Sequence, residues 1–263
     1  MILIGTSGFS YADWVGSFYP AALPKAAWLA FYSRHFRVCE LNFSYYRVPT
    51  AHTLARMVEQ TGGQMEFIVK AHKEMTHERG EHASVFAAFA QAVAPLREAR
   101  RLGAVLAQFP YSFHATRDNA AYLERFRGLI GDLPVVIEFR NAAWMAEATF
   151  LLLKRLHYGF CCVDEPHLPG LIPPLAVATS EIGYVRFHGR NREKWWQHKA
   201  SEERYDYCYT DAELQEWTPK IRALDKAAAR VYVLMNNHPK GSAAQNAKRL
   251  QELLDFAHPE HEK

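Results

Sequence analysis

The chain has 263 residues, of which 49% are hydrophobic and 22% are charged, a balance typical of ordinary folded proteins rather than of disordered or fibrous ones. Its formal net charge of +3 is too small to indicate nucleic-acid binding by itself. No apolar run approaches the length of a membrane span, and the first residues lack the basic region and cleavage site of a signal peptide, so we expect a cytoplasmic protein without a membrane partner.

Eight apolar runs rich in β-branched residues predict strands. Most are continuous rather than alternating, which is the pattern of parallel strands buried on both faces. In chain order the runs cover Ile2–Thr6, Val38–Asn42, Met65–Lys70, Gly103–Phe109, Pro134–Phe139, Tyr158–Asp164, Gly183–His188 and Arg230–Asn236.

Amphipathic stretches between these runs predict helices. Pro24 is expected at the first position of one helix, and Thr50 is expected to be the N-cap of the next. Further helices are predicted over Ala83–Ala99, Asn119–Leu129, Ala146–Leu156, Asp211–Ala228 and Ser242–Phe256.

This alternation of strands and helices indicates parallel βαβ units, and eight units need about 250 residues. The sequence therefore predicts a single α/β domain, a (β/α)8 TIM-like barrel over residues 1–257, with a short polar tail at 258–263. An open doubly wound sheet is the alternative, but the chain has no glycine-rich dinucleotide loop.

Two connections depart from the regular scheme. Four prolines between Pro166 and Pro174 forbid a regular helix in the sixth crossover, where Leu175–Thr179 is a candidate extra strand. After the seventh strand, Gly189–Thr210 is a long loop that holds five tryptophan or tyrosine residues. Long loops inside compact domains are usually lids or binding loops.

The four cysteines form no C-x-x-C pair, and three of them lie in apolar runs. We expect reduced and mostly buried thiols, as in cytoplasmic proteins. For the adjacent Cys161 and Cys162, a redox role is the alternative to packing in the core.

Polar or ionisable residues stand at the C-terminal end of every predicted strand. In a barrel these ends converge on one face, where catalytic groups come from several strands. Glu40 and Asn42, like two other such pairs, lie two apart and should point the same way. We assign acid/base roles to Glu40, Glu138 and His188, and the stabilisation of developing negative charge to Lys70 and Arg186. For each of them alone, a structural ion pair or a buried core position is the alternative.

A second group is expected to bind the substrate. Arg190, Lys240 and the helix beginning at Ser242 would form an anion site above the seventh and eighth strands, although Ser242 also reads as an ordinary helix start. The predicted substrate-binding residues are Ser7, Tyr11, Asn42, Tyr45, Arg47, His72, His77, Arg140, Asp164, Arg190, Asn236, Asn237 and Lys240.

No cofactor is predicted, because the chain has no H-E-x-x-H or H-x-H spacing. A divalent metal ion held by oxygen and nitrogen donors from several strands is the alternative. Its candidate ligands are Glu40, His72, His77, Glu138, Asp164 and His188.

An ordered set of motifs resembles the YecE-like family, also called the domain of unknown function 72 family. The motifs are Gly5–Trp14, Phe18–Pro20, Glu40–Pro49, Lys70–His77, Gln108–Pro110, Glu138–Arg140, Tyr184–Arg190 and Met235–Asn246. The family usually has N-S-T-F-Y-R where this chain has N-F-S-Y-Y-R. The resemblance implies a TIM-like barrel, similar to that of the sugar isomerase and endonuclease IV group, but it implies no reaction.

We therefore expect an enzyme, a hydrolase, lyase or isomerase, that acts on a small anionic substrate by acid/base chemistry at the C-terminal face of the barrel. The substrate would be phosphorylated or polyhydroxylated. One alternative is an endonuclease IV-like protein that binds nucleic acid and stacks bases on rim aromatics. A non-catalytic ligand-binding barrel is the other.

Overall fold

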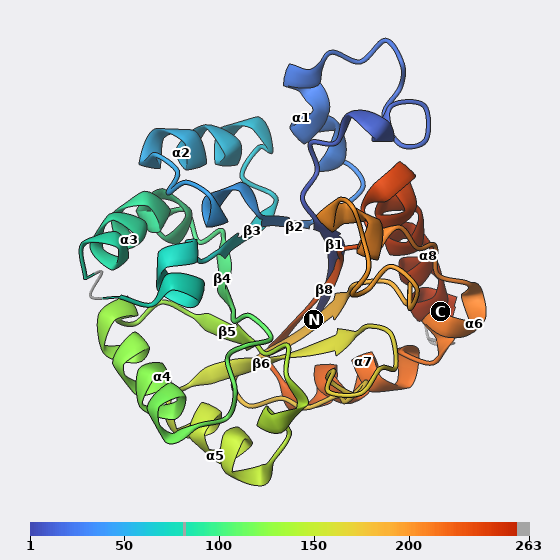
Figure 1. Cartoon of the computed structure of the whole chain (residues 1–263). Helices are drawn as coiled ribbons and strands as arrows, with labels where there is room; N and C mark the ends of the chain where they lie inside the picture. The colour runs from blue at the N-terminus through green and yellow to red at the C-terminus, as the bar shows by residue number, and fades with distance from the viewer. Residues whose placement is uncertain (81–82, 257–263) are drawn as a thin grey trace.

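Eight parallel strands close into a barrel in this computed structural model, which describes residues 1–80 and 83–256. The strands follow chain order and the first pairs with the last, which confirms the predicted TIM-like barrel (Figure 1). Their bounds are β1 Ile2–Ser7, β2 Val38–Leu41, β3 Glu66–Lys70, β4 Leu102–Gln108, β5 Val135–Glu138, β6 Tyr158–Asp164, β7 Ile182–Phe187 and β8 Arg230–Met235. Residues 257–263, which include the predicted domain end and the polar tail, lie outside the described residues.

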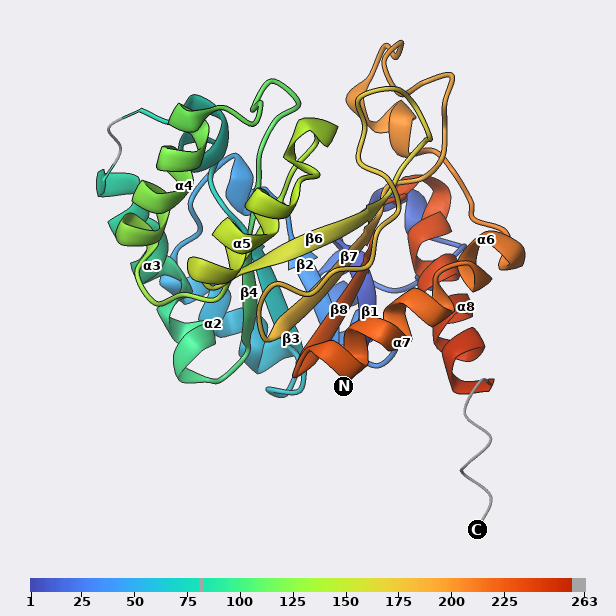
Figure 2. The ribbon, with the colours of Figure 1, turned by 90° about the horizontal axis from the view of Figure 1, so that it is seen from below.

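Helices surround the barrel and leave the C-terminal ends of the strands facing the loops (Figures 1 and 2). They are α1 Trp28–Tyr32, α2 Ala51–Gln60, α3 Ala83–Glu98, α4 Arg117–Ile130, α5 Glu147–Arg155, α6 Asp211–Gln215, α7 Thr218–Ala227 and α8 Ser242–Phe256. The Thr50 side chain accepts a hydrogen bond from the Thr53 amide, as expected of an N-cap. None of the helices in the described residues has the length and apolar character needed to cross a bilayer.

Two predicted helices differ in detail. Pro24 is the cap of a short 3₁₀ turn, Lys25–Ala27, rather than the first residue of a helix. The helix predicted over Asp211–Ala228 is divided into α6 and α7, because Pro219 has no amide hydrogen to continue the bonding pattern across the junction.

The sixth crossover is irregular, as predicted, but its expected extra strand is wrong. Residues 165–181, all of them described, contain no helix or strand. The amide of Val177 faces the Cys162 sulfur at 3.4 Å instead of a neighbouring strand. A closed barrel has no free edge to which another strand could add, because β6 already pairs with β5 and β7.

Tyrosine side chains fill the barrel interior below its mouth. Tyr232 from β8 donates a hydrogen bond of 2.5 Å to Glu66. A Cβ atom at Gly103 would lie 2.7 Å from the Tyr232 hydroxyl and 2.8 Å from a methyl carbon of Ile68, so this close approach requires glycine. Higher up, the Tyr184 hydroxyl donates to Glu40 at 2.8 Å and supports the site above it.

Candidate active site

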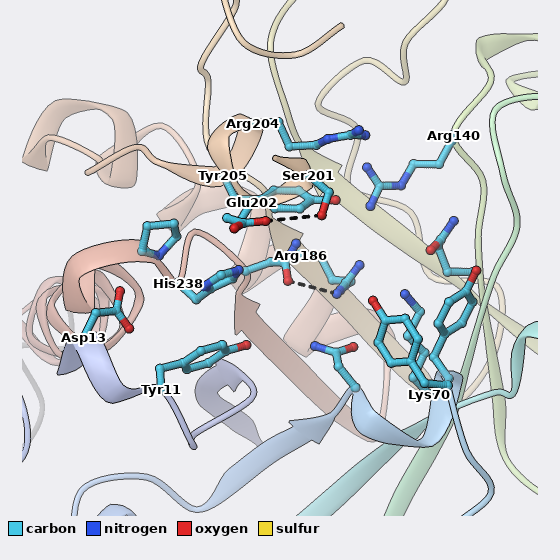
Figure 3. Close-up of a pocket in the computed structure, with 16 residues that line it drawn as sticks. Tyr11, Asp13, Lys70, Arg140, Arg186, Ser201, Glu202, Arg204, Tyr205 and His238 are labelled. Atoms are coloured by element: carbon cyan, nitrogen blue, oxygen red, sulfur yellow. Dashed lines mark hydrogen bonds between the residues drawn. The ribbon is translucent and has the colours of Figure 1, made fainter. Parts of the chain in front are cut away.

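A pocket of about 700 Å³ lies at the C-terminal ends of the strands. Side chains from seven strand ends or the loops after them reach it, together with the long loop that follows β7 (Figure 3). They include Tyr11, Asn42, Tyr45, Lys70, Gln108, Arg140, Arg186, Arg204, Tyr205 and Asn236. The expected convergence of distant polar strand ends on one face is present.

Arg186 forms the centre of a buried ion network across the barrel. Its Nε and Nη2 atoms donate to the two Glu40 carboxylate oxygens at 3.0 and 2.6 Å, in a bidentate pair. Its Nη1 atom donates to Glu138 at 2.6 Å. Both carboxylates are fully buried, so β2, β5 and β7 are joined by charges that water does not screen.

Glu138 contacts more than one cation. Its Oε1 atom lies 2.5 Å from Arg140 Nε, while Oε2 accepts from Arg186. Burial alone would raise the pKa of Glu138, but the charges of Arg140 and Arg186 outweigh burial and hold it well below its ordinary value. Glu138 is therefore an ionised anchor for two arginines and a weak base.

His188 is fully buried, and both of its ring nitrogens face protein groups. Asn236 accepts from Arg186 through Oδ1 at 3.3 Å, which places its Nδ2 atom 3.1 Å from His188 Nδ1. Because an amide nitrogen only donates, Nδ1 accepts and the ring proton belongs on Nε2, 3.2 Å from Glu138. Burial and the charge of Arg140 lower the pKa of His188 to about 3, so the ring is neutral.

Lys70 lies at the end of β3 and points into the pocket (Figure 3). Its Nζ atom is 4.7 Å from the centre of the Tyr45 ring, and its backbone carbonyl accepts from Ser44 at 2.6 Å. Across residues 1–80 and 83–256, no side chain forms a hydrogen bond or ion pair with Nζ. Burial, assisted by the charge of Arg186, lowers the pKa of Lys70 to about 8.

The long loop after β7 covers part of the pocket. Its 3₁₀ turn, Ser201–Tyr205, brings Arg204 and Tyr205 to the mouth (Figures 2 and 3). Tyr209 fixes its far end, because the hydroxyl accepts from the Gly189 amide at 2.8 Å and donates to Asp164 at 2.7 Å. The predicted binding loop is thus a lid anchored at both ends.

A smaller cavity of about 230 Å³ adjoins the main pocket under the same loop. Arg140, Arg204 and Tyr205 line both spaces, so the two lie side by side. Its outer wall is aromatic: Trp196 is 52% exposed, and its ring centre lies 5.2 Å from that of Tyr111.

Comparison with known proteins shows which family has this sequence and fold. A family model described as "Protein of unknown function DUF72" matches residues 3–263. The chain belongs to the DUF72 family. The UPF0759 protein YunF of Bacillus subtilis (strain 168) is 36% identical over 272 residues, which cover 97% of this chain and 95% of that protein.

Solved structures of DUF72 family proteins have the same fold. One from Thermotoga maritima MSB8 is 37% identical, with a TM-score of 0.90, and the match covers 97% of this chain and 99% of that one. Another, from Enterococcus faecalis, is 28% identical with a TM-score of 0.87, covering 98% and 97%. The family and the barrel are therefore established, whereas a shared fold does not assign a reaction.

In this DUF72 protein most of the residues predicted to act together do meet. The network or the pocket contains Ser7, Tyr11, Glu40, Asn42, Tyr45, Lys70, Glu138, Arg140, Arg186, His188 and Asn236. Ser7 is held inside by Arg186, which donates to its hydroxyl at 3.4 Å. His77 lines the smaller cavity instead, where burial and the charge of Lys70 lower its pKa to about 4.

Asp164 and Arg190 belong to a different cluster. Arg190 donates to both oxygens of Asp164 at 2.9 and 2.7 Å and also contacts Glu216. Trp217 from the α6–α7 junction donates to Asp164 at 2.7 Å. The Asp164 side chain thus faces the helices rather than the barrel interior. Asp164 and Glu216 pair with the guanidinium of Arg190, which was expected to bind a substrate anion.

Four other predicted binding residues also lie away from the pocket lining. His72 is buried with Nδ1 3.8 Å from Glu74, while Asn237 donates to the Tyr207 carbonyl and to Asn246. Lys240 pairs with Asp206 at 2.7 Å on the surface, and Arg47 is exposed. The cations that face the pocket come instead from β3, β5, β7 and the lid.

Arg204 and Glu165 are residues near the pocket that the sequence did not predict. Arg204 lies in an irregular loop, where no periodic pattern shows which side chains turn inward. Glu165 accepts from the Ile172 amide at 2.9 Å, and its other oxygen lies 3.7 Å from Arg140. Burial raises the pKa of Glu165 to about 7. The sequence placed Asp164 in the site instead; because the Asp164 side chain faces outward, that of its neighbour Glu165 faces inward.

No metal centre emerges from these contacts. Within the described ranges, 1–80 and 83–256, no group of three or more His, Cys, Asp or Glu side chains is arranged to hold a metal ion. The nitrogen and oxygen donors named as candidates are distributed among the ion network, the Asp164 cluster and the loop after β3.

Proposed function

We propose that this DUF72 protein is an enzyme that acts on a small polyhydroxylated molecule carrying a phosphate or carboxylate group. The observation that carries this proposal is a cluster of cations that line the pocket, Lys70, Arg140, Arg186 and Arg204. Glu40 and Glu138 pair with Arg186 and Arg140, and Glu165 lies 3.7 Å from Arg140, while Asp13 and Glu202 also line the pocket. An anion bound beside Lys70, Arg140 and Arg204 would interact with these cations in a site of low dielectric constant.

Arg204 and Arg140 are the side chains we propose to hold the anionic group. They line both cavities, so an anion between them would lie where the two spaces meet. The Arg204 Nε atom is buried and has no hydrogen-bond partner in the described residues. Guanidinium groups bind phosphate and carboxylate with paired, charge-assisted hydrogen bonds.

The opposite side of the pocket suits hydroxyl groups. Asp13 and His238 lie far from Lys70 and Arg140 in Figure 3, with Tyr11 beside them. Asn42 presents a buried Oδ1 atom without a hydrogen-bond partner in the described residues, and it would accept from a substrate hydroxyl. These groups match the uncharged part of a sugar or sugar acid.

Lys70 is the group we propose to act on the substrate. With a pKa of about 8, it exists as both ammonium and amine near neutral pH, so it can exchange a proton or act as an amine. Glu40 and Glu138, expected from sequence to do this work, hold arginines, and His188 orients Asn236 and Glu138. All four cysteines are free thiols, so we propose that the enzyme works in the reducing cytoplasm.

Calorimetric titration would test the anion site, using ribose 5-phosphate, gluconate and uncharged ribose. We expect the two anions to bind and ribose to bind far more weakly. The Arg204→Ala variant should lose about 10- to 100-fold in affinity for ribose 5-phosphate, because a charge-assisted hydrogen bond contributes about 1.5–3 kcal/mol.

Arg192→Ala is the matched control, since Arg192 is exposed on the same loop and does not line the pocket. Equal affinity for ribose and its phosphate would contradict the proposal. Turnover of a bound anion, followed by nuclear magnetic resonance of the mixture, separates an enzyme from a binding protein.

A further inference from the structure

Among the described residues that line the pocket, Lys70 is the one lysine, and the other possible nucleophiles are hydroxyl groups, including that of Ser201, and the ring of His238. The Ser7 hydroxyl is fully buried beneath Arg186. Cys161 and Cys39 lie in the barrel wall, where burial raises the pKa of both thiols and keeps them protonated. The Lys70 amine, by contrast, lines the open space, and within residues 1–80 and 83–256 it is engaged only by the face of the Tyr45 ring.

The surroundings of Lys70 favour the neutral amine. Arg186 from β7 and Arg140 after β5 repel a positive charge, whereas Glu138 and Glu40 attract it. Both carboxylates are already engaged by the arginines and do not reach Nζ. The Tyr45 ring lies beside Nζ, and the positive charge of Lys70 contributes to the lowered pKa of His77. An ammonium kept only for its charge would need acceptors for its three N–H bonds.

Resting on the proposed function, we propose that Lys70 forms a covalent imine with an aldehyde or ketone carbon of the substrate, while Arg140 and Arg204 hold its anionic group. The Nζ lone pair adds to the carbonyl carbon, and one Nζ proton passes to the carbonyl oxygen to give a carbinolamine. The second Nζ proton passes to that hydroxyl, which leaves as water, and a C=N bond forms. No oxidant or reductant is required.

This step explains why a cationic pocket would hold a lysine with a depressed basicity. An imine nitrogen in this pocket becomes a cation on protonation, and it withdraws an electron pair from a bond at the adjacent carbon. The reaction class is therefore the cleavage, formation or migration of a bond next to the carbonyl group, as in a lyase or an isomerase. The substrate class is a carbonyl compound with a phosphate or carboxylate group.

Borohydride trapping tests this proposal. The protein is mixed with dihydroxyacetone phosphate, with pyruvate, or with an oligonucleotide containing an abasic site, and each mixture is treated with sodium borohydride. We expect a reduced adduct on intact protein, located to Lys70 by peptide mass spectrometry. An adduct with the small molecules identifies a free metabolite as the carbonyl source, and an adduct with the oligonucleotide identifies DNA, with the same chemistry at Lys70.

Two variants sharpen the result. Lys70→Arg keeps the positive charge but cannot form an imine, so trapping should fall at least a hundredfold while ribose 5-phosphate still binds. Lys73→Arg alters a lysine three residues away that is paired with Glu78, and it should trap like the unaltered protein. Lys70→Met serves as a second variant if Lys70→Arg fails to show the native melting transition.

Trapping that survives in Lys70→Arg and Lys70→Met, or that spreads evenly over surface lysines, would overturn the proposal. Absence of any adduct while ribose 5-phosphate binds in an Arg204-dependent way would overturn the imine and leave the proposed function standing. If the unaltered protein does not bind ribose 5-phosphate, the proposed function itself is wrong.

Discussion

Neighbours decide what each ionisable side chain in this site can do. Lys70 and Lys73 are three residues apart, yet their pKa values move in opposite directions. Burial and Arg186 lower that of Lys70 to about 8, whereas a hydrogen bond to Glu78 raises that of the exposed Lys73. The same contrast separates Glu138, held ionised by arginines, from Glu165, whose pKa burial raises to about 7.

The buried His188 makes stability depend on pH. Its pKa falls from an ordinary 6.5 to about 3 in the folded protein, so the unfolded chain binds its proton first. Its contribution is complete above pH 6.5 and is lost as pH falls from 6.5 towards 3. Glu138 acts in the same direction below pH 4.5, where only the unfolded state takes up a proton.

We therefore expect the free energy of unfolding to decrease between pH 6.5 and 4, measured by urea denaturation at each pH. In His188→Gln the slope should be shallower by one proton, about 1.4 kcal/mol per pH unit. His52→Gln, at an exposed position of α2, should keep the original slope. An unchanged slope in His188→Gln would refute the assignment of a buried neutral ring.

The sequence was informative at this scale where strand periodicity applies. Glu40, Glu138 and Arg186 were found because a polar residue in an apolar strand has few explanations other than a site or an ion pair. Asp164 was misplaced because one step along a strand reverses the direction of the side chain. Arg204 could not be found, since an irregular loop has no period.

At the scale of elements, close packing inside the barrel depends on one glycine. Gly103 in β4 leaves room for Tyr232 and Ile68, and an added Cβ would meet both within 2.8 Å. We expect Gly103→Ala to lower the free energy of unfolding by about 1–3 kcal/mol through overpacking. Urea denaturation measures the change.

Gly128 in α4 supplies a control of opposite sign. Nothing lies within 4 Å of a Cβ at this exposed helical position. Gly128→Ala should therefore raise the free energy of unfolding by about 0.5–1 kcal/mol, since alanine is the better helix former. If Gly103→Ala raised the free energy of unfolding as Gly128→Ala does, the packing described for Gly103 would be wrong.

Local signals predicted elements well where they were strong. The bounds of α8 and the Thr50 cap are found as expected. The division between α6 and α7 was missed, although Pro219 stood in the sequence, because a proline in the first turn of a new helix looks like one inside a long helix. The strand expected at Leu175–Thr179 was excluded by barrel closure, which is not a local property.

For the whole molecule, closure of the barrel predicts how its thiols react. Cys39, Cys161 and Cys162 are buried, with thiol pKa values raised by burial, whereas Cys208 is exposed. We expect one thiol to react quickly with Ellman's reagent in the native protein and four in denaturant. If the barrel unfolds as one unit, the three slow thiols should react together. Fast labelling of Cys161 would contradict the described wall of the site.

The layer of Tyr184 and Tyr232 beneath the ion network has a kinetic consequence. Because these tyrosines fill the barrel interior below the ion network, a product formed above Arg186 leaves at the same C-terminal face at which the substrate enters. Departure then precedes the next arrival, and a lingering product would act as a competitive inhibitor of its own formation.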